Sequence, residues 1–305
     1  MTLTTTTERS TESACACGDR ETCGGQLRDE GVPRDSGGGG QGIGADLEAA
    51  DLSGRPSATV VLPTYCERSS VGPVLDELLS LHCVERVIVV DDDSPDGTAT
   101  FVRRAFDRET LRGKVSVIVR PGGDDLASAV CRGFTEADSD VLVCMDADGQ
   151  HPPGAVPALV APVAAGTPIA VGSRHAGEGR VDANWSRVRE AMSFGGSLLA
   201  WAAVPESRAT QDPMSGFFAI RSPVFEAARH RLKPTGHKIL LELLAQCPIG
   251  RVVEVPIRFR PREAGESKTD AAEVLSYLRH MSRLAVRARQ RPTVDRERRV
   301  REVRR

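Results

Sequence analysis

The residues best suited to chemistry follow a short apolar run, V-L-V-C-M, which leads into the sequence D-A-D-G-Q-H-P-P. Side chains of an extended chain alternate between two faces, so Asp146, Asp148 and Gln150 project to one side if the extended form continues. Three oxygen-bearing side chains at a strand end suit a hard cation, Mg²⁺ or Mn²⁺, better than zinc. Such a cation keeps positions open for substrate phosphates. The pattern therefore predicts a metal site that serves a phosphorylated substrate.

The segments around this motif predict the framework that positions it. Helical periodicity from Val71 to Leu81, after S-P-D-G-T, and from Leu126 to Thr135 alternates with short β-branched runs. Alternating strands and helices give a mostly parallel central sheet with helices on both faces, a doubly wound α/β fold. The expected buried strands are A-T-V-V-L-P-T-Y (58–65), which Pro63 should end, R-V-I-V-V (86–90), V-S-V-I-V (115–119) and V-L-V-C-M (141–145).

Polar clusters follow three of these strands, at 63–67, 91–93 and 146–150. Ligands of such sheets bind outside the carboxyl ends of the strands. We therefore expect the three clusters to form one site along one edge of the sheet. The alternative is that these segments are polar only because they are loops.

Composition limits the class of protein. The chain has 305 residues, 40% hydrophobic and 27% charged, with a net charge of −2, which fits a globular protein and argues against bulk nucleic-acid binding. No run approaches the roughly 18 apolar residues of a membrane span, and no secretion signal is evident. We expect a cytoplasmic protein whose thiols at Cys83, Cys131, Cys144 and Cys247 are buried. Cys15, Cys17 and Cys23 lack a fourth ligand nearby, which favours an incidental cluster over zinc.

The chain divides by composition into three parts. Residues 1–56, rich in Thr, Ser, Glu and Gly, are expected to form a disordered tail, followed by a catalytic domain at 57–268. Residues 269–305 are expected to form a basic amphipathic helix and tail; from Ser276 onward they carry 11 arginines and three acidic residues, a side-chain net charge of +8. This arm either binds a membrane surface or packs its apolar stripe on the catalytic domain. The stripe is Val274, Leu275, Leu278, Met281, Leu284 and Ala285.

Several motifs resemble those of family 2 glycosyltransferases and, more narrowly, of dolichol-phosphate mannosyltransferases. They are P-T-Y-C-E (63–67), V-D-D-D-S-P-D-G-T (90–98), M-D-A-D-G-Q-H-P-P (145–153), G-S-R (172–174), N-W-S-R-V-R-E-A-M-S (184–193), D-P-M-S-G-F-F (212–218) and R-E-A-G-E-S-K (262–268). The likeness runs in order from about Ala58 to Arg283. It implies the GT-A nucleotide-diphospho-sugar transferase fold.

The resemblance also implies residue roles. The guanosine of a GDP-sugar would contact Pro63, Tyr65, Glu67, Val90 and Asp92, and the rest of the donor Asp146, Ala147 and Lys238. The metal ligands would be Asp146, Asp148 and Gln150. The reacting groups would be served by Asp148, Arg174, Arg189, Ser193, Arg262 and Lys268, with Asp212 supporting the acceptor side. Arg189 and Ser193 are four apart, so on a helix they share a face and could grip one acceptor phosphate.

The activity implied is metal-dependent, inverting transfer of mannose from GDP-mannose to dolichyl or another polyprenyl phosphate. A phosphate monoester is already ionised near neutral pH, so its oxygen can attack the sugar without a dedicated base. The diphosphate and lipid phosphate bring negative charges together, which requires cations such as these arginines. A lipid acceptor predicts peripheral association with the cytoplasmic face of the membrane, through the basic arm.

Three departures from the family pattern keep alternatives open. Cys66 replaces a usual Asn, Gly149 replaces a usual Leu, and Asp124 and Asp125 stand where a Lys-Gly pair is usual. The acidic pair leaves donor preference open, including another hexose or a UDP donor, and is the one feature that favours a catalytically silent nucleotide-sugar-binding adaptor. Sugar nucleotidyl transfer would need a glycine-rich phosphate loop after the first strand, which P-T-Y-C-E is not.

Overall fold

The computed structural model describes residues 57–107, 111, 113–123, 125–181, 187–233, 238–247, 249–260 and 281–284, with side chains throughout except at 180–194. The proposed tail at 1–56 and most of the basic arm lie outside these ranges, so the domain boundaries stay predictions. Within the described part, no helix is long and apolar enough to cross a membrane.

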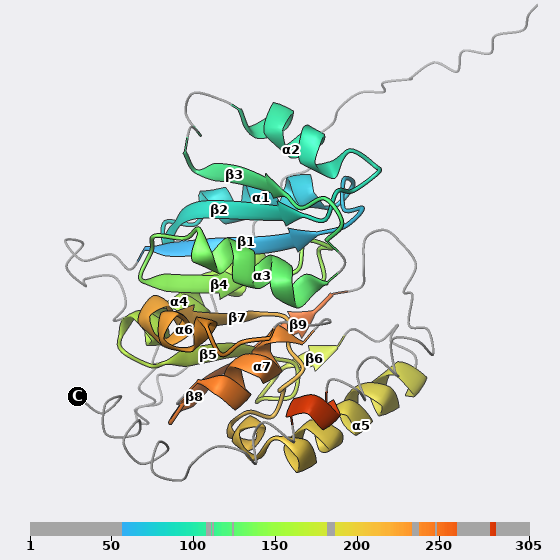
Figure 1. Ribbon diagram of the computed structural model, residues 1–305, viewed down its shortest axis with the longest axis vertical. Coiled ribbons are helices and arrows are strands. Elements are labelled where there is room, and N and C mark those ends of the chain that lie inside the picture. The colour runs from blue at the N-terminus through green and yellow to red at the C-terminus, as the bar shows by residue number, and fades with distance from the viewer. Residues whose placement is uncertain are drawn as a thin grey trace, which may run out of the picture. The chain divides into compact units, whose positions relative to one another are not determined.

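A seven-stranded sheet forms the centre of the fold, in the order β3-β2-β1-β4-β7-β5-β8 (Figure 1). All neighbouring pairs are parallel except those that β7 makes with β4 and β5, which confirms the mostly parallel sheet. A two-stranded parallel sheet joins β6 to β9. The strands are β1 Ala58–Thr64, β2 Val84–Asp91, β3 Val115–Val119, β4 Val141–Cys144, β5 Ile169–Ser173, β6 Arg180–Val181, β7 Phe218–Arg221, β8 Val252–Pro256 and β9 Arg258–Phe259.

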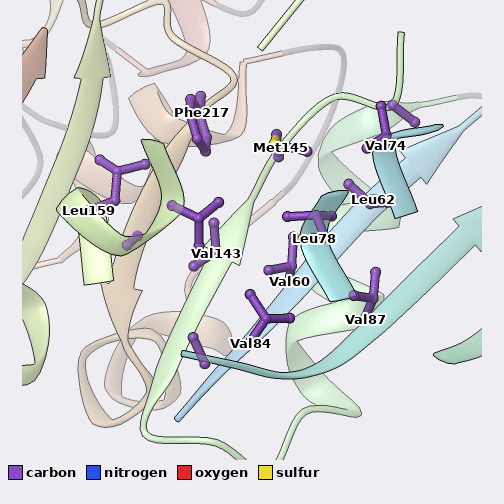
Figure 2. Packing of buried hydrophobic residues seen from close by; sticks show 14 of the residues in the cluster. Val60, Leu62, Val74, Leu78, Val84, Val87, Val143, Met145, Leu159 and Phe217 are labelled. Carbon is purple, nitrogen blue, oxygen red and sulfur yellow. The ribbon is translucent and has the colours of Figure 1, made fainter. Parts of the chain in front are cut away.

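Helices cover both faces of the sheet, as predicted. Side chains of α1, α2 and α4 share one core cluster with alternate strand residues (Figure 2), and side chains of α3, α6 and α7 share the other. The helices are α1 Val71–Ser80, α2 Thr98–Phe106, α3 Leu126–Thr135, α4 Val156–Ala164, α5 Arg187–Ala203, α6 Ser222–Arg229 and α7 Ile239–Gln246, with short 3₁₀ helices η3 Pro153–Ala155 and η4 Pro205–Ala209.

The β-branched composition of the strands follows from this double burial. In β1, Val60 and Leu62 enter one cluster while Val61 enters the other, and all three are fully buried. A strand covered on both faces needs apolar residues at every position, not only at alternate ones. Helix α3 lies close against β1 at Gly133, where a Cβ atom would come within 2.4 Å of Val61 Cγ1.

Strand β1 does not end at Pro63, contrary to the expectation from sequence, but continues to Thr64. Proline has no N–H to donate, so it is normally kept out of central strands. The carbonyl of Val61 accepts from Met145 N on the β4 side, and Pro63, two residues on, faces the same side. The paired residues of β4 stop at Cys144, opposite Val61, so the missing N–H of Pro63 removes no ladder bond.

Part of the C-terminal stripe packs on the domain that contains the central sheet. Met281 and Leu284 are 2% and 1% exposed and belong to a third apolar cluster with residues of α5 and α7. These two residues therefore pack in the protein core, which is the second of the two alternatives for the stripe, and are not exposed for contact with a membrane.

The described cysteines form no disulfide with one another. Cys144 and Cys247 are buried as expected, whereas Cys83 and Cys131 are half-buried. Burial raises the pKa of the Cys131 thiol to about 12, which makes it a poor nucleophile.

Candidate active site

The loops after β1 and β2 are fastened together by Asp91. Its carboxylate accepts hydrogen bonds from Thr64 Oγ1 (2.7 Å) and from the backbone N and Oγ of Ser94 (2.9 and 2.7 Å). Ser94 Oγ in turn accepts from Cys66 N at 2.9 Å. Asp91 is buried. Its role in the acidic run 91–93 is therefore structural, because it connects the ends of β1 and β2.

The predicted donor residues on β1 and β2 occupy different environments. Tyr65 is 56% exposed, which leaves its ring face open to a stacking partner. Glu67 accepts from Ser70 Oγ at 2.7 Å and lies just before α1. Pro63 and Val90 are register partners inside the sheet, and the Val90 side chain belongs to the core.

Asp92 is held by an arginine that the sequence analysis did not single out. Arg120, just after β3, donates from Nε to Asp92 Oδ1 at 2.7 Å, and its Nη2 lies 2.5 Å from the same oxygen. The guanidinium also donates to Ser128 Oγ (2.6 Å) and to the carbonyl of Asp125 (3.0 Å). Its place at the carboxyl end of a strand is the signal that could have found it.

Asp125 has a local structural role. It is the N-cap of α3, and its carboxylate accepts from the backbone N of Ser128 (2.9 Å) and from Ser128 Oγ (2.8 Å). An acidic N-cap stabilises a helix start because it satisfies an otherwise unpaired N–H group. Half of the unusual Asp124–Asp125 pair is thus explained by helix capping, while Asp124 lies outside the described residues.

The two other departures lie where the backbone has positive φ. Cys66 has φ 61°, a conformation that Asn adopts more readily than Cys, which accounts for Asn as the usual family residue. Gly149 has φ 78°, where glycine carries no steric penalty. The glycine therefore suits the turn that follows Asp148.

The metal motif does not continue β4, so strand alternation does not place its side chains as the sequence analysis assumed. The strand ends at Cys144, and the chain turns so that Gln150 N donates to Asp148 Oδ1 at 3.0 Å. Gln150 Nε2 donates to the carbonyl of Arg260 at 3.2 Å. Turn geometry, not an extended strand, sets the directions of Asp148 and Gln150.

A buried histidine holds this turn by accepting a hydrogen bond from its backbone. His151 Nδ1 accepts from Asp146 N at 3.2 Å, and the ring centroid lies 5.2 Å from that of Phe217 and 5.3 Å from that of Phe259. Burial lowers the pKa of His151 to about 4, so the ring is neutral near pH 7. With Nδ1 accepting, the proton lies on Nε2, which leaves neither nitrogen as a metal ligand.

The side chains of the turn carry oxygen atoms, the kind of ligand that a hard divalent cation prefers. The Asp146 side chain is 33% exposed and packs over Gly216, where a Cβ would come within 3.0 Å of Oδ2. Asp148 is 4% exposed. Among the described residues no group of three His, Cys, Asp or Glu side chains is arranged for a metal. Two carboxylates and the Gln150 amide oxygen would leave several positions of a Mg²⁺ or Mn²⁺ ion to phosphate oxygens.

Arg174, after β5, is locked onto Asp212. Its Nε and Nη2 donate to Asp212 Oδ2 (2.8 Å) and Oδ1 (2.7 Å), and its backbone N donates to Oδ2 at 3.1 Å. Burial alone would raise the pKa of Asp212, but the hydrogen bonds and charge of Arg174 outweigh it and lower that pKa. The guanidinium carbon also lies 5.5 Å from the ring centroid of Phe259.

The segment before Asp212 is fixed in its turn by Glu254 of β8. Glu254 Oε1 accepts from Thr210 Oγ1 and from Gln211 N, both at 2.8 Å. Thr210 Oγ1 accepts from Asp212 N at 3.1 Å. Arg174 is therefore positioned by a chain of hydrogen bonds that reaches β8, the strand next to β5.

Residues 59–227 match the profile of glycosyl transferase family 2. The chain is 42% identical over 229 residues to "Dolichol-phosphate mannosyltransferase" of Pyrococcus furiosus, covering 74% of this chain and 63% of that protein. It is 35% identical over 242 residues to the protein of the same name from Mycosarcoma maydis, covering 76% and 80%. The chain belongs to glycosyl transferase family 2. It spans less than two thirds of the length of the Pyrococcus protein.

Solved structures agree with the GT-A fold. Glucosyl-3-phosphoglycerate synthase from Mycobacterium tuberculosis in complex with UDP superposes with a TM-score of 0.56 at 20% identity, over 78% of this chain and 82% of that one. The same enzyme with Mn²⁺ and UDP-glucose gives a TM-score of 0.57 at 19% identity, over 78% and 81%. At this identity the likeness establishes the fold alone.

This family 2 glycosyltransferase brings several predicted residues together around His151. The His151 ring and the Arg174 guanidinium both contact Phe259, at 5.3 and 5.5 Å from its ring centroid, and Arg174 is bound to Asp212. The charges of Asp148 and Lys238 also act on the pKa of His151. Lys238 is the residue just before α7. The backbone places Arg189 and Ser193 one turn apart on α5, and Ala147 is buried beside the two carboxylates. Arg262 and Lys268 lie outside the described residues, so their roles stay predictions.

Proposed function

We propose that this glycosyltransferase moves mannose from GDP-mannose to dolichyl or another polyprenyl phosphate, with inversion at the sugar carbon and with Mg²⁺ or Mn²⁺. The observation that carries the proposal is the approach of the Asp146–Asp148 turn to the Arg174–Asp212 pair, since the ring of His151, which follows that turn, and the guanidinium of Arg174 both contact Phe259. Relatives named dolichol-phosphate mannosyltransferase, and one named "Undecaprenyl-phosphate mannosyltransferase" from Micrococcus luteus at 33% identity, support the sugar and the acceptor class.

On the donor side, the base would lie between the loops that follow β1 and β2. Tyr65 offers an exposed ring for stacking, and a carboxylate such as Asp92 can accept from the adjacent N–H groups of guanine. Asp146, Asp148 and Gln150 would hold the divalent ion. Once bound, that ion would neutralise charge on the departing diphosphate.

On the acceptor side, no general base is required. The phosphate monoester is largely ionised near pH 7, and one of its oxygens attacks the anomeric carbon as the bond to the diphosphate breaks. His151 does not serve as the base, because its Nδ1 already accepts a hydrogen bond and burial lowers its pKa to about 4, which makes the ring a weak proton acceptor. Arg174, fixed by Asp212, supplies a preorganised positive charge for the meeting of the two phosphate groups.

A transfer assay with purified full-length protein tests this proposal. The assay uses Mg²⁺ or Mn²⁺, a short dolichyl phosphate, and radiolabelled GDP-mannose beside UDP-glucose. Label in the lipid phase from GDP-mannose, and its loss with a chelator, is the expected result. Transfer from UDP-glucose alone would show that the donor is UDP-glucose and not GDP-mannose. Nucleotide binding without any transfer would favour a catalytically silent adaptor.

We further propose that the enzyme works at the cytoplasmic face of the membrane. The acceptor is a lipid, and the arm from Ser276 has a side-chain charge of +8, which anionic headgroups attract. Flotation with anionic liposomes is expected for the full chain and reduced after truncation beyond Gln290. Equal flotation of both proteins would argue that this tail is not the anchor.

A further inference from the structure

The Asp92–Arg120 pair connects the base-binding edge of the site to α3. Arg120 contacts three segments at once, through Asp92 after β2, Ser128 in α3 and the carbonyl that precedes α3. The side chains of Arg120 and Asp92 are only 16% and 11% exposed. An arginine with three acceptors and little exposure has few alternative rotamers, so it fixes the direction of the carboxylate that it binds.

The contact uses only one oxygen of Asp92. Arg120 Nε and Nη2 both approach Oδ1, at 2.7 and 2.5 Å, so Oδ2 takes no part in the pair. Burial raises the pKa of Asp92, and the nearby charges of Asp125 and Asp91 act in the same direction. The hydrogen bond and charge of Arg120 oppose this rise, so Arg120 is the group that favours the ionised carboxylate.

Gly123 leaves room for the Asp92–Arg120 pair only because glycine has no side chain. A Cβ on Gly123 would come within 2.7 Å of Asp92 Oδ1 and 3.1 Å of Arg120 Nη2. These distances are too short for any side chain unless the ion pair moves. The sequence of the β3–α3 loop is therefore matched to the placement of Asp92.

We propose that Arg120 is a positioning residue that sets the base preference of the donor site by holding Asp92 in the direction required to accept from adjacent N–H groups of a purine. The inference rests on the proposed guanine-nucleotide donor. Guanine offers a ring N–H beside an exocyclic amino group, whereas hypoxanthine keeps the ring N–H alone and uracil lacks the adjacent amino group. Arg120 itself is not expected to touch the nucleotide.

The test is calorimetric titration of the full-length protein with GDP, IDP and UDP in Mg²⁺. The natural protein should bind GDP more tightly than IDP by on the order of tenfold, since a hydrogen bond to a charged group is lost. Arg120→Met should weaken GDP binding by about tenfold and reduce the GDP-to-IDP ratio to near one. Arg120→Lys keeps the charge but not the three contacts, and should lose most of the same preference.

Arg86 provides a matched control. It also bridges β2 to neighbouring segments, through Ser116 Oγ (3.2 Å) and the carbonyl of Glu136 (3.3 Å), but it lies near the start of β2, at the opposite edge of the sheet. Arg86→Met should leave all three affinities unchanged. If Arg120→Met or Arg86→Met acted only by lowering the stability of the protein, that variant would bind both GDP and IDP more weakly by the same factor.

Coupling to Asp92 gives the decisive result. Asp92→Asn should lose the same preference, and the Arg120→Met, Asp92→Asn double variant should lose no more than either single one. A folded Arg120→Met or Arg120→Lys protein that keeps the full GDP-to-IDP ratio would overturn the proposal. Tighter binding of UDP than of GDP by the natural protein would contradict the proposed guanine donor. In that case, the role of Arg120 in base preference would be tested by whether its variants lose the preference for UDP.

Discussion

Asp212 holds Arg174 through three hydrogen bonds, one from the backbone N and two from the guanidinium, across 38 residues of sequence. Asp212 is fully buried, and its own backbone N is fixed by Thr210. A paired arginine with this support cannot drift toward solvent, so its charge faces the site before substrate arrives. This preorganisation is what electrostatic catalysis requires.

Asp212→Asn should therefore damage both stability and turnover. The amide nitrogen would face an arginine donor, which leaves a buried charge without its counter-ion and costs about 3–5 kcal/mol of unfolding free energy. We expect transfer activity to fall on the order of 100-fold, because misplaced catalytic groups lose that much. Glu226→Gln, which removes an exposed ion pair with Arg229, should change the unfolding free energy by less than about 1 kcal/mol.

The same variant has a defined pH dependence. Since the folded pKa of Asp212 is lowered, its stabilising effect is complete above the unfolded value, about 3.9, and is lost as the pH falls through the folded pKa. The difference in unfolding free energy between the natural protein and Asp212→Asn should be constant from pH 7 to about pH 5 and shrink below pH 4. A difference that shrank already at pH 6 would contradict this assignment.

His151 should make the folded protein less stable in mild acid. Its pKa is about 4 in the folded state because of burial, against about 6.5 when unfolded, so the unfolded chain alone takes up a proton between these values. The unfolding free energy should fall by up to roughly 3 kcal/mol between pH 6.5 and pH 4. His151→Asn, which can still accept from Asp146 N, should show a flatter profile in chemical denaturation, and an unchanged slope would refute the buried neutral ring.

Removal of one carboxylate from the metal motif should abolish transfer while the fold persists. Asp148→Ala or Asp146→Asn is expected to lose turnover and Mn²⁺ binding measured by calorimetry, since few other oxygens are available to the ion. Asp93→Asn is the matched control, because Asp93 is exposed at the same sheet edge and Asn tolerates its φ of 54°. Full activity in a purified Asp148→Ala protein would contradict the proposed metal-dependent mechanism.

Gly133→Ala should destabilise the protein by about 1–3 kcal/mol through overpacking against Val61. The second change Val61→Ala should recover part of that loss, because the new methyl group enters the space that it opens. Gly195→Ala, on α5 with open space around it, should instead be neutral or stabilising. Thermal unfolding of the natural protein, the three single variants (Val61→Ala among them) and the double variant checks this, and additive losses in the double variant would exclude the close contact.

The C-terminal stripe should contribute to the stability of the catalytic domain. Leu284→Ala should cost about 2–5 kcal/mol of unfolding free energy, because Leu284 is buried in the cluster with α5 and α7. Arg283→Ala, at an exposed neighbour, should change it by less than about 0.5 kcal/mol. If both variants unfold like the natural protein, residues 281–284 do not belong to the core.

The sequence by itself determined the elements from β1 to β4 and their order. The β-branched runs and helical periodicities placed α3 at Leu126–Thr135 and β3 at Val115–Val119, as the structure has them. These patterns are local, because burial on both faces of a strand or on one face of a helix leaves its mark within a few residues. The motifs in matching order were also enough to indicate the family.

Only the tertiary structure decided which side chains meet. Arg120 binds Asp92 across 28 residues, and His151 sits between Phe217 and Phe259 from two other segments. No local pattern encodes such pairings, since they depend on how separate loops converge at the sheet edge. The extended form that alternation assumed does not continue past Cys144, where β4 ends, and the chain then turns through Gly149 with φ 78°. Packing of distant segments, not propensity, thus set the direction of each functional group.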